Sequence, residues 1–215
     1  MKKPSLSEIK KRNLFLIFTG RALTVFAGIL ISFFLPFYLK EQGLTILEIG
    51  SILTFGLAIG YFTFSVVFGR ILKKIKLKTG LKTGAFLSFL SSIIFAIFPT
   101  NIGTVVSNTS DKIDDLVTRI SSDVGLQHNA EKEKRKITSQ YLIIDGLAMF
   151  FGFLIGLILF ETIGFRIALA IFSLVGLSAF FVYNGVSDKT RFKPKKDKKE
   201  LPKTKNLLKL YLAGE

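Results

Sequence analysis

The 215-residue chain is at once strongly apolar and strongly basic. Apolar residues make up 49% of it, with 23 Phe, and the mean hydropathy is +0.48, yet 30 Lys and Arg face 15 Asp and Glu, a net charge of +15. A disordered basic protein lacks such apolar content, and a soluble domain rarely combines the two properties. The absence of Cys and the single His exclude disulfides, thiolate metal sites, a Cys nucleophile and a multi-His metal centre within one chain. Most classes of soluble enzyme are therefore disfavoured.

Five long apolar runs alternate with charged segments along the chain. A bilayer core of ~30 Å needs ~20 apolar residues in helical form. Each run carries at most one charged residue and is apolar around the whole helix, as lipid or a fully buried core requires. The runs predict membrane-spanning helices at residues 14–39, 46–69, 83–100, 137–160 and 162–186.

The basic residues predict which side of the membrane each connection faces. Residues 1–13, 70–82, 131–136 and 187–215 hold 25 of the 30 Lys and Arg. Positive charge in short loops marks the cytoplasmic side, so we expect a multi-pass protein of the plasma (cytoplasmic) membrane with both termini in the cytoplasm. The charge is then a topology signal, and no nucleic-acid partner is expected. All four segments share one side only if residues 101–126 also cross.

Residues 101–126 have the periodicity of a helix but are poor in apolar residues. An apolar stripe is formed by Ile102, Val105, Val106, Ile113, Leu116, Val117, Ile120 and Val124. Asp111, Asp114 and Asp115 lie opposite the stripe, and Asp115 is spaced to pair with Arg119 at i,i+4. One interpretation is a membrane-spanning helix whose polar face borders a water-filled cavity. The other is an amphipathic helix lying on the membrane surface or in solution.

Three stretches resemble a known family of transporters. The sequence LPFYLKEQGLTILEIGSILTFG (35–56) is similar to the end of helix one, the short outer loop and the start of helix two in the major facilitator superfamily. The sequence GFRIALAIF (164–172) resembles the start of their helix six. Between them, DVGLQHNAEKEKRKITSQYLIIDGLAMFFGFLIG (123–156) resembles their connection between helices four and five.

The resemblance implies an all-α fold and half of a transporter. Members of that family have two six-helix halves, each a pair of inverted three-helix repeats. This chain therefore resembles the N-terminal six-helix half, and residues 187–215 resemble the central cytoplasmic loop. The cavity of such a transporter lies between two halves. The resemblance thus implies a second half as partner, supplied by another chain, by a homodimer or by missing C-terminal sequence.

The family's motif between helices two and three, G-x-L-A-D-R-x-G-R-K/R, is degenerate in this chain. Lys73 replaces the acidic position, so a swapped gating pair between Lys73 and Asp123 is one hypothesis. The alternative is that the lysines are topology signals facing lipid headgroups. The gating candidates are Gly69, Arg70, Lys73, Lys74, Lys78 and Asp123.

Charged residues inside the predicted spans are the candidates for substrate binding or ion coupling, because ionisable groups inside a membrane are costly and usually functional. They are Arg21, Asp111, Asp114, Asp115, Arg119 and Asp145. Arg21 could meet an anionic substrate or a helix-four aspartate, or extend to the inner headgroups. Asp145 is expected to be a packing or gating partner.

The sequence thus predicts a secondary transporter, or half of one, that moves a small solute by alternating access. The alternative is a non-transporting membrane scaffold or assembly protein built on the same half-fold. An enzyme is not expected, since no nucleophile–base pair or metal-ligand set is present, and no cofactor is expected. The sequence does not specify the solute.

Overall fold

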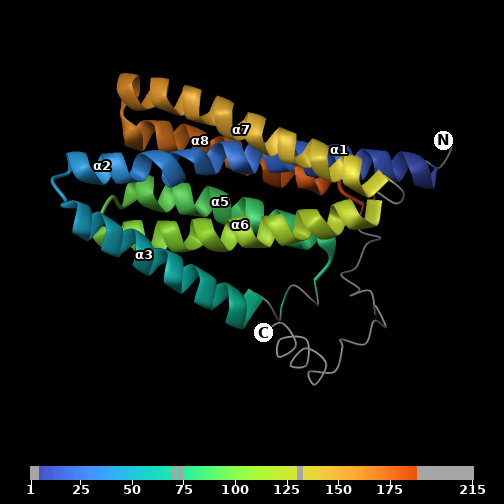
Figure 1. The fold of residues 1–215 in the computed structure, drawn as a ribbon, viewed down its shortest axis with the longest axis horizontal. Coiled ribbons are helices and arrows are strands. Elements are labelled where there is room, and N and C mark those ends of the chain that lie inside the picture. The colour runs from blue at the N-terminus through green and yellow to red at the C-terminus, as the bar shows by residue number, and fades with distance from the viewer. Residues whose placement is uncertain (1–4, 69–70, 72–74, 130–132, 188–215) are drawn as a thin grey trace, which may run out of the picture.

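The computed structural model describes residues 5–68, 71, 75–129 and 133–187, and this part of the chain is built from helices without strands (Figure 1). The helices are α1 (Leu6–Ile29), the π-helix η1 (Leu30–Phe34), α2 (Leu35–Glu41), α3 (Ile46–Thr63), the π-helix η2 (Phe64–Phe68), α5 (Leu77–Ile97), α6 (Asn101–Asn129), α7 (Lys134–Ile163) and α8 (Phe165–Asn184). Since η1 joins α1 directly to α2, and η2 continues α3, the described chain forms six long continuous helical segments, which we call rods.

Five of these rods are long and apolar enough to cross a membrane, which indicates a multi-pass membrane protein. The candidate spans are Ser7–Glu41, Ile46–Val67, Leu77–Ile97, Arg135–Ile163 and Phe165–Asn184. They correspond to the five predicted runs, but the helices extend beyond them. α1 begins eight residues before the predicted run 14–39 (at Leu6), and α5 begins at Leu77 where the sequence predicted a loop to residue 82. The helices therefore continue through polar residues that flank the apolar runs and would lie outside the bilayer core.

Local sequence signals account for the helix starts and for the irregular middle of the first rod. Ser5 and Glu8 form a capping box at α1, and Thr45 and Glu48 form another at α3. Each box satisfies backbone N–H groups that the first turn leaves free. Pro36 has no N–H to donate to the carbonyl four residues earlier, and the π-helix η1 precedes it.

Hydrogen bonds between distant segments show which helix ends meet. At one end of the bundle, Lys78 Nζ donates to Asn184 O at 2.7 Å, and the backbone N–H of Ser187 donates to Asn13 Oδ1 at 3.0 Å. Asn13 Nδ2 also reaches Asn129 Oδ1, at 3.5 Å. The starts of α1 and α5 therefore lie beside the ends of α6 and α8, on the right in Figure 1. Described basic residues of three segments, 1–13, 70–82 and 131–136, belong to this end, which we call the basic end.

The opposite end holds the short connections α2–α3, α5–α6 and α7–α8, on the left in Figure 1. Arg166, in the first turn of α8, donates from Nε and Nη2 to Ala96 O in the last turn of α5, at 3.1 and 2.9 Å. Tyr38, Phe95 and Phe165 pack their rings together there. α6 starts at this end and finishes at the basic end, so it runs the full length of the bundle.

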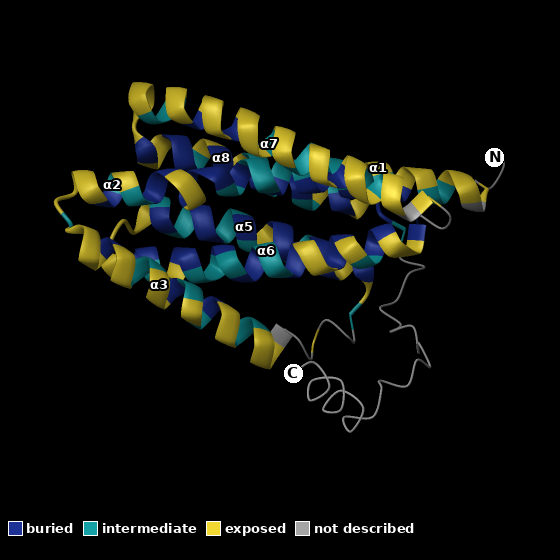
Figure 2. Ribbon diagram, in the orientation of Figure 1, coloured by how far each residue is buried: buried dark blue, intermediate teal, exposed yellow. Residues whose placement is uncertain are grey.

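α6 lies inside the bundle with its small polar face inward. It packs against α5, α3 and α1, and Figure 2 shows buried residues along its length. The buried face consists mainly of Gly, Ser, Thr, Asn and Asp, whereas Ile102 of the apolar stripe is 78% exposed. Within the stripe, Ile113 and Val117 are buried and Val106 and Ile120 are exposed. Small residues allow helix backbones to approach closely, which in a membrane replaces the hydrophobic effect between helices.

The path of α6 predicts that its two ends are accessible from opposite sides of the membrane. Because the chain has no Cys, single-Cys variants can be labelled without background. A membrane-impermeant maleimide should label Thr100→Cys from the same side as Gln42→Cys, and Gln127→Cys from the same side as Lys136→Cys, since each pair lies at one end of the bundle. If Thr100→Cys and Gln127→Cys were labelled from the same side, α6 would not cross.

Candidate functional site

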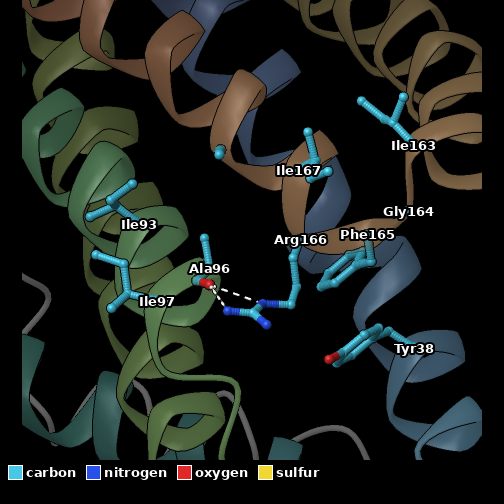
Figure 3. Close-up of a pocket in the computed structure, with 10 residues that line it drawn as sticks. Tyr38, Ile93, Ala96, Ile97, Ile163, Gly164, Phe165, Arg166 and Ile167 are labelled. Atoms are coloured by element: carbon cyan, nitrogen blue, oxygen red, sulfur yellow. Dashed lines mark hydrogen bonds between the residues drawn. The ribbon is translucent and has the colours of Figure 1, made fainter.

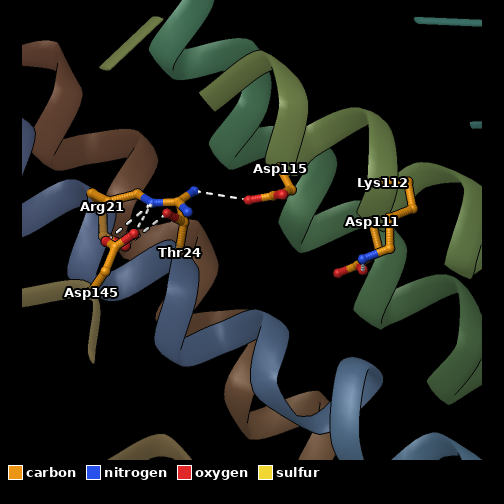
Figure 4. Close-up of polar contacts among 6 residues, drawn as sticks. All are labelled: Arg21, Thr24, Asp111, Lys112, Asp115 and Asp145. Carbon is orange, nitrogen blue, oxygen red and sulfur yellow. Dashed lines mark hydrogen bonds and ion pairs between the residues drawn. The ribbon is translucent and has the colours of Figure 1, made fainter. Parts of the chain in front are cut away.

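The centre of the site is the buried guanidinium of Arg21 in α1. Its Nε lies 3.2 Å from both carboxylate oxygens of Asp145 in α7, and its Nη1 lies 3.1 Å from Asp115 Oδ1 in α6 (Figure 4). The Arg21 side chain is only 7% exposed. Of the alternatives predicted for Arg21, the structure therefore shows contact with an aspartate of residues 101–126, namely Asp115. The buried side chain does not extend to the headgroups. One cation on α1 links three helices.

Two further aspartates of α6 lie near this pair, Asp111 one turn before Asp115 and Asp114 next to it in the sequence. Asp111 is 5% exposed and its Oδ2 lies 3.6 Å from Lys112 Nζ, a residue that the sequence analysis did not single out. Asp114 is 6% exposed, and its Oδ2 has no hydrogen-bond partner among residues 5–68, 71, 75–129 and 133–187. Asp111, Asp114 and Asp115 all line one cavity, although their carboxylates do not converge on a single point.

These side chains line a cavity of about 170 Å³ between α1, α6 and α7. Its lining residues are Arg21, Thr24, Val25, Gly28, Ile29, Ser32, Phe33, Asp111, Lys112, Asp114, Asp115 and Met149. Phe33 in η1 and Met149 in α7 are exposed, so the cavity reaches the molecular surface beside these two helices. Five of the twelve lining residues are charged, which makes this a polar cavity inside an apolar bundle.

Charged residues continue from the cavity along the surface of α6 toward the basic end. Asp115 is 42% exposed at its side chain, and Arg119 and Asp123 are exposed one and two turns further on. The helix spacing allows Asp115 to pair with Arg119, but the structure pairs the Asp115 carboxylate with Arg21. A buried guanidinium that needs a counter-ion is a better partner than an exposed one. Arg119 does not line the cavity.

Most of the predicted gating residues lie outside the described residues, namely Gly69, Arg70, Lys73 and Lys74. The same holds for most of the basic tail, from residue 188 onward. Of the others, Lys78 binds the last carbonyls of α8 through Asn184 O, and Asp123 is exposed on α6. The hypothetical pair of Lys73 with Asp123 therefore has one described member.

A second, larger cavity lies at the opposite end of the bundle and contains none of the predicted site residues. It has a volume of about 640 Å³ and is lined mainly by apolar side chains of α5 and α8, with Tyr38 on one side (Figure 3). Its only charged lining residue is Arg166, whose guanidinium is held by Ala96 O. This arrangement joins two helix ends and offers no group for chemistry.

Sequence reasoning missed the neutral part of the polar cavity. Thr24 lies one turn beyond Arg21, and its Oγ1 donates to Arg21 O at 2.9 Å. Gly28, one turn further, leaves room for Asp111, since a Cβ placed there would lie 3.6 Å from Asp111 Oδ1. The spacing Arg21, Thr24, Gly28 is that of one helix face, and this period was the signal that could have found them.

Neither a cluster of metal ligands among the described residues nor a match to a known sequence indicates an activity for the cavity. Within the part of the chain that the structure describes, no group of three or more His, Cys, Asp or Glu residues is arranged to hold a metal ion. The chain matches no protein-family model and no curated protein sequence, so its function must be argued from the cavity itself.

Proposed function

We propose that this protein is a secondary transporter, or half of one, which moves a small solute across the cytoplasmic membrane by alternating access. The observation that carries the proposal is the charged cavity midway along a bundle of membrane-spanning helices, with four aspartates and two cations gathered around α1. Charges in a membrane interior are expensive, and they typically mark a substrate or ion pathway.

The exposed charges on α6 support the proposal, because they require water beside the bundle. Asp115, Arg119 and Asp123 follow each other at intervals of four residues along one line of the helix. Lipid against this line would leave three ionisable groups in hydrocarbon, at a cost of roughly 2.5–3.5 kcal/mol for each charge near the bilayer centre. A water-filled cleft between this face and a second half avoids that cost. Residues 101–126 then form a sixth crossing.

The order of helix packing supports the family resemblance. α3 packs on α6 as α7 packs on α1, and α5 packs on α6 as α8 packs on α1, while α5 and α8 pack on each other. Exchanging the first three long helices with the last three leaves this set of contacts unchanged. Such an exchange is what two inverted three-helix repeats of a major facilitator half would produce.

A second half would also cover α3, which packs on α6, and α7, which packs on α1. In their most apolar stretches only 17% and 11% of the residues are buried, compared with 44%, 44% and 39% in the first rod, α5 and α8. We therefore propose that the partner is a second six-helix half, either another copy of this chain or a C-terminal half. It would bind α3 and α7 and close the cleft over α6.

The competition for Arg21 suggests how the helices could alternate between states. Asp115 on α6 and Asp145 on α7 share one guanidinium on α1. Strengthening one ion pair at the expense of the other changes which helix α1 is held against. A solute that pairs with a carboxylate therefore has different contact energies in the two arrangements, as a ligand must have to shift a conformational equilibrium.

The second candidate function is a non-transporting scaffold or assembly protein built on the same half-fold. The exposed apolar faces of α3 and α7 favour it, because they could bind any other membrane protein. A scaffold does not need the buried carboxylates around Arg21, however, and would be more stable with apolar residues in their place. The two functions therefore differ in what the charged residues do.

Transport into proteoliposomes tests the proposal. Currents on a solid-supported membrane would be recorded while amines, amino acids, carboxylates and sugars are added in turn to the reconstituted chain. We expect at least one solute to give a saturable current that Asp114→Asn abolishes and that Glu161→Gln, at an exposed carboxylate far from the cavity, leaves unchanged. If the chain were reconstituted as a dimer, or with its second half, and no solute gave a current, the scaffold function would be favoured.

A further inference from the structure

The charge balance of the polar cavity favours a positively charged ligand. The cavity is lined by three carboxylates (Asp111, Asp114 and Asp115) and two cations (Arg21 and Lys112), and a fourth carboxylate, that of Asp145, pairs with Arg21 beside it. Arg21 is already engaged on both sides, by Asp115 and by Asp145. An anionic solute would find this guanidinium occupied and three carboxylates lining the same space.

Asp114 carries the unused binding capacity of the cavity. It is more than nine-tenths buried, it lines the cavity, and its Oδ2 has no hydrogen-bond partner within the described residues. A buried acceptor without a partner costs roughly 1–3 kcal/mol, and more when it is charged. A ligand that donates a hydrogen bond and carries a positive charge would remove both parts of this cost.

The size and walls of the cavity narrow the ligand further. A volume of about 170 Å³ is below the range of ≈ 300–1,000 Å³ found for drug-sized ligands. Val25, Phe33 and Met149 provide an apolar wall beside the carboxylates. A metal ion is a poor match, because the described acidic residues do not converge as a set of three ligands. The remaining chemistry is a small molecule with an ammonium group and a short hydrocarbon part.

We propose that the cavity binds a small protonated amine, whose ammonium group donates a hydrogen bond to Asp114 Oδ2 and whose alkyl part lies against Val25, Phe33 and Met149. This inference deepens the proposed function by giving the class of its solute, and as a transport statement it rests on that function. As a statement about binding it can be tested without transport.

The test is ligand binding to the full chain in phosphatidylcholine nanodiscs at constant ionic strength. The probes are n-propylammonium chloride, tetramethylammonium chloride, sodium propionate and sodium chloride, and the melting temperature is measured as each concentration rises. A ligand that binds only the folded state raises stability by RT ln(1 + [L]/Kd), so the Kd follows from the curve. We expect a saturable rise with n-propylammonium, a weaker one with tetramethylammonium, which has no N–H donor, and none with either sodium salt.

Variants connect the binding to Asp114. Asp114→Asn should weaken the binding of n-propylammonium at least about tenfold, equivalent to 1.4 kcal/mol, and Asp114→Glu should recover part of it. Glu161→Gln, in the last turn of α7 and outside the cavity, is the matched control and should bind like the unchanged chain. Met149→Trp narrows the cavity from an exposed position and should also weaken binding, which keeps the test decisive if Asp114→Asn does not fold.

Several results would overturn the inference. These are stabilisation by propionate or by sodium ion in place of the amine, an equal Kd in the unchanged chain and in Asp114→Asn, or no effect of Met149→Trp. Failure here is distinguishable from failure of the proposed function. Transport of an anion or a sugar would contradict the amine site but support the transport function. Amine binding without any transport would support the amine site but contradict the transport function.

Discussion

Arg21→Leu is expected to lower the free energy of unfolding by about 3–5 kcal/mol, because it breaks a buried ion-pair cluster from one side. The change removes the guanidinium that Asp115 and Asp145 share and leaves two carboxylates without a counter-ion, one of them half-buried in α7. The measurement is unfolding of the purified chain in mixed micelles of increasing denaturing-detergent content, followed by circular dichroism.

Two variants test whether this loss comes from the uncompensated charges. Arg21→Leu combined with Asp115→Asn and Asp145→Asn should recover most of the stability, because no charge is then left unpaired. Arg119→Leu, one turn from Asp115 but exposed, should change the stability by less than about 0.5 kcal/mol. If Arg21→Leu unfolded at the same detergent content as the unchanged chain, the ion pairs would not hold α1, α6 and α7 together.

Gly84→Leu is expected to destabilise the bundle by about 1–3 kcal/mol, or to prevent folding, because α5 and α6 leave no room for a side chain there. A Cβ at Gly84 would overlap Thr118 Oγ1 and lie 3.1 Å from Thr118 Cβ and 3.2 Å from its backbone nitrogen. Rotation of the threonine removes the first contact but not the other two. The helices would have to separate, and α6 would lose part of its buried polar face. The unfolding assay described for Arg21 measures the effect.

Gly146 in α7 supplies the matched control for this substitution. A Cβ there would meet nothing within 4 Å, so Gly146→Leu should leave the stability unchanged or raise it, since Leu favours helix over Gly. A cost at Gly146 equal to that at Gly84 would mean that the effect comes from the helix backbone and not from the α5–α6 contact.

The packing of α5 on α6 is what allows a weakly apolar helix to lie inside the bundle. Gly80 faces Ser121 and Gly84 faces Thr118, so the two backbones approach closely along two turns. Ser107 Oγ donates to Ser91 O at 2.7 Å in the same contact. Small polar residues thus face a neighbouring helix, while Asp111, Asp114 and Asp115 of α6 line the cavity. The cavity therefore depends on this contact, although none of these residues lines it.

The sequence was sufficient for everything that depends on composition along the chain. Five apolar runs became the five candidate spans, since the energetics of burying about 20 apolar residues depend on local sequence alone. The described basic residues of the segments 1–13, 70–82 and 131–136 lie at one end of the bundle, as their grouping indicated, because each connection inherits its side from the number of helices before it. The charged residues inside the bundle were also visible as interruptions of apolar runs.

The tertiary structure alone decided which of those charges meet. Arg21 is separated from Asp115 by 94 residues and from Asp145 by 124, and local periodicity carries no information about such contacts. The helix spacing allowed Asp115 to pair with Arg119, but the Asp115 carboxylate pairs with the buried Arg21 on another helix. Thr24 and Gly28 likewise line the cavity only because α6 packs against α1.

The inward face of α6 marks the limit of the sequence most clearly. Its apolar stripe and its face of Ser, Thr, Gly and Asn both repeat with the helix period, so periodicity predicted a helix but not which face packs. In water the apolar stripe would have turned inward. Beside lipid the hydrophobic effect does not distinguish a neighbouring helix from the bilayer, and close packing of small residues decides the orientation. Five long apolar runs in the sequence indicated a multi-pass membrane protein, and helix packing determined where its charges gather.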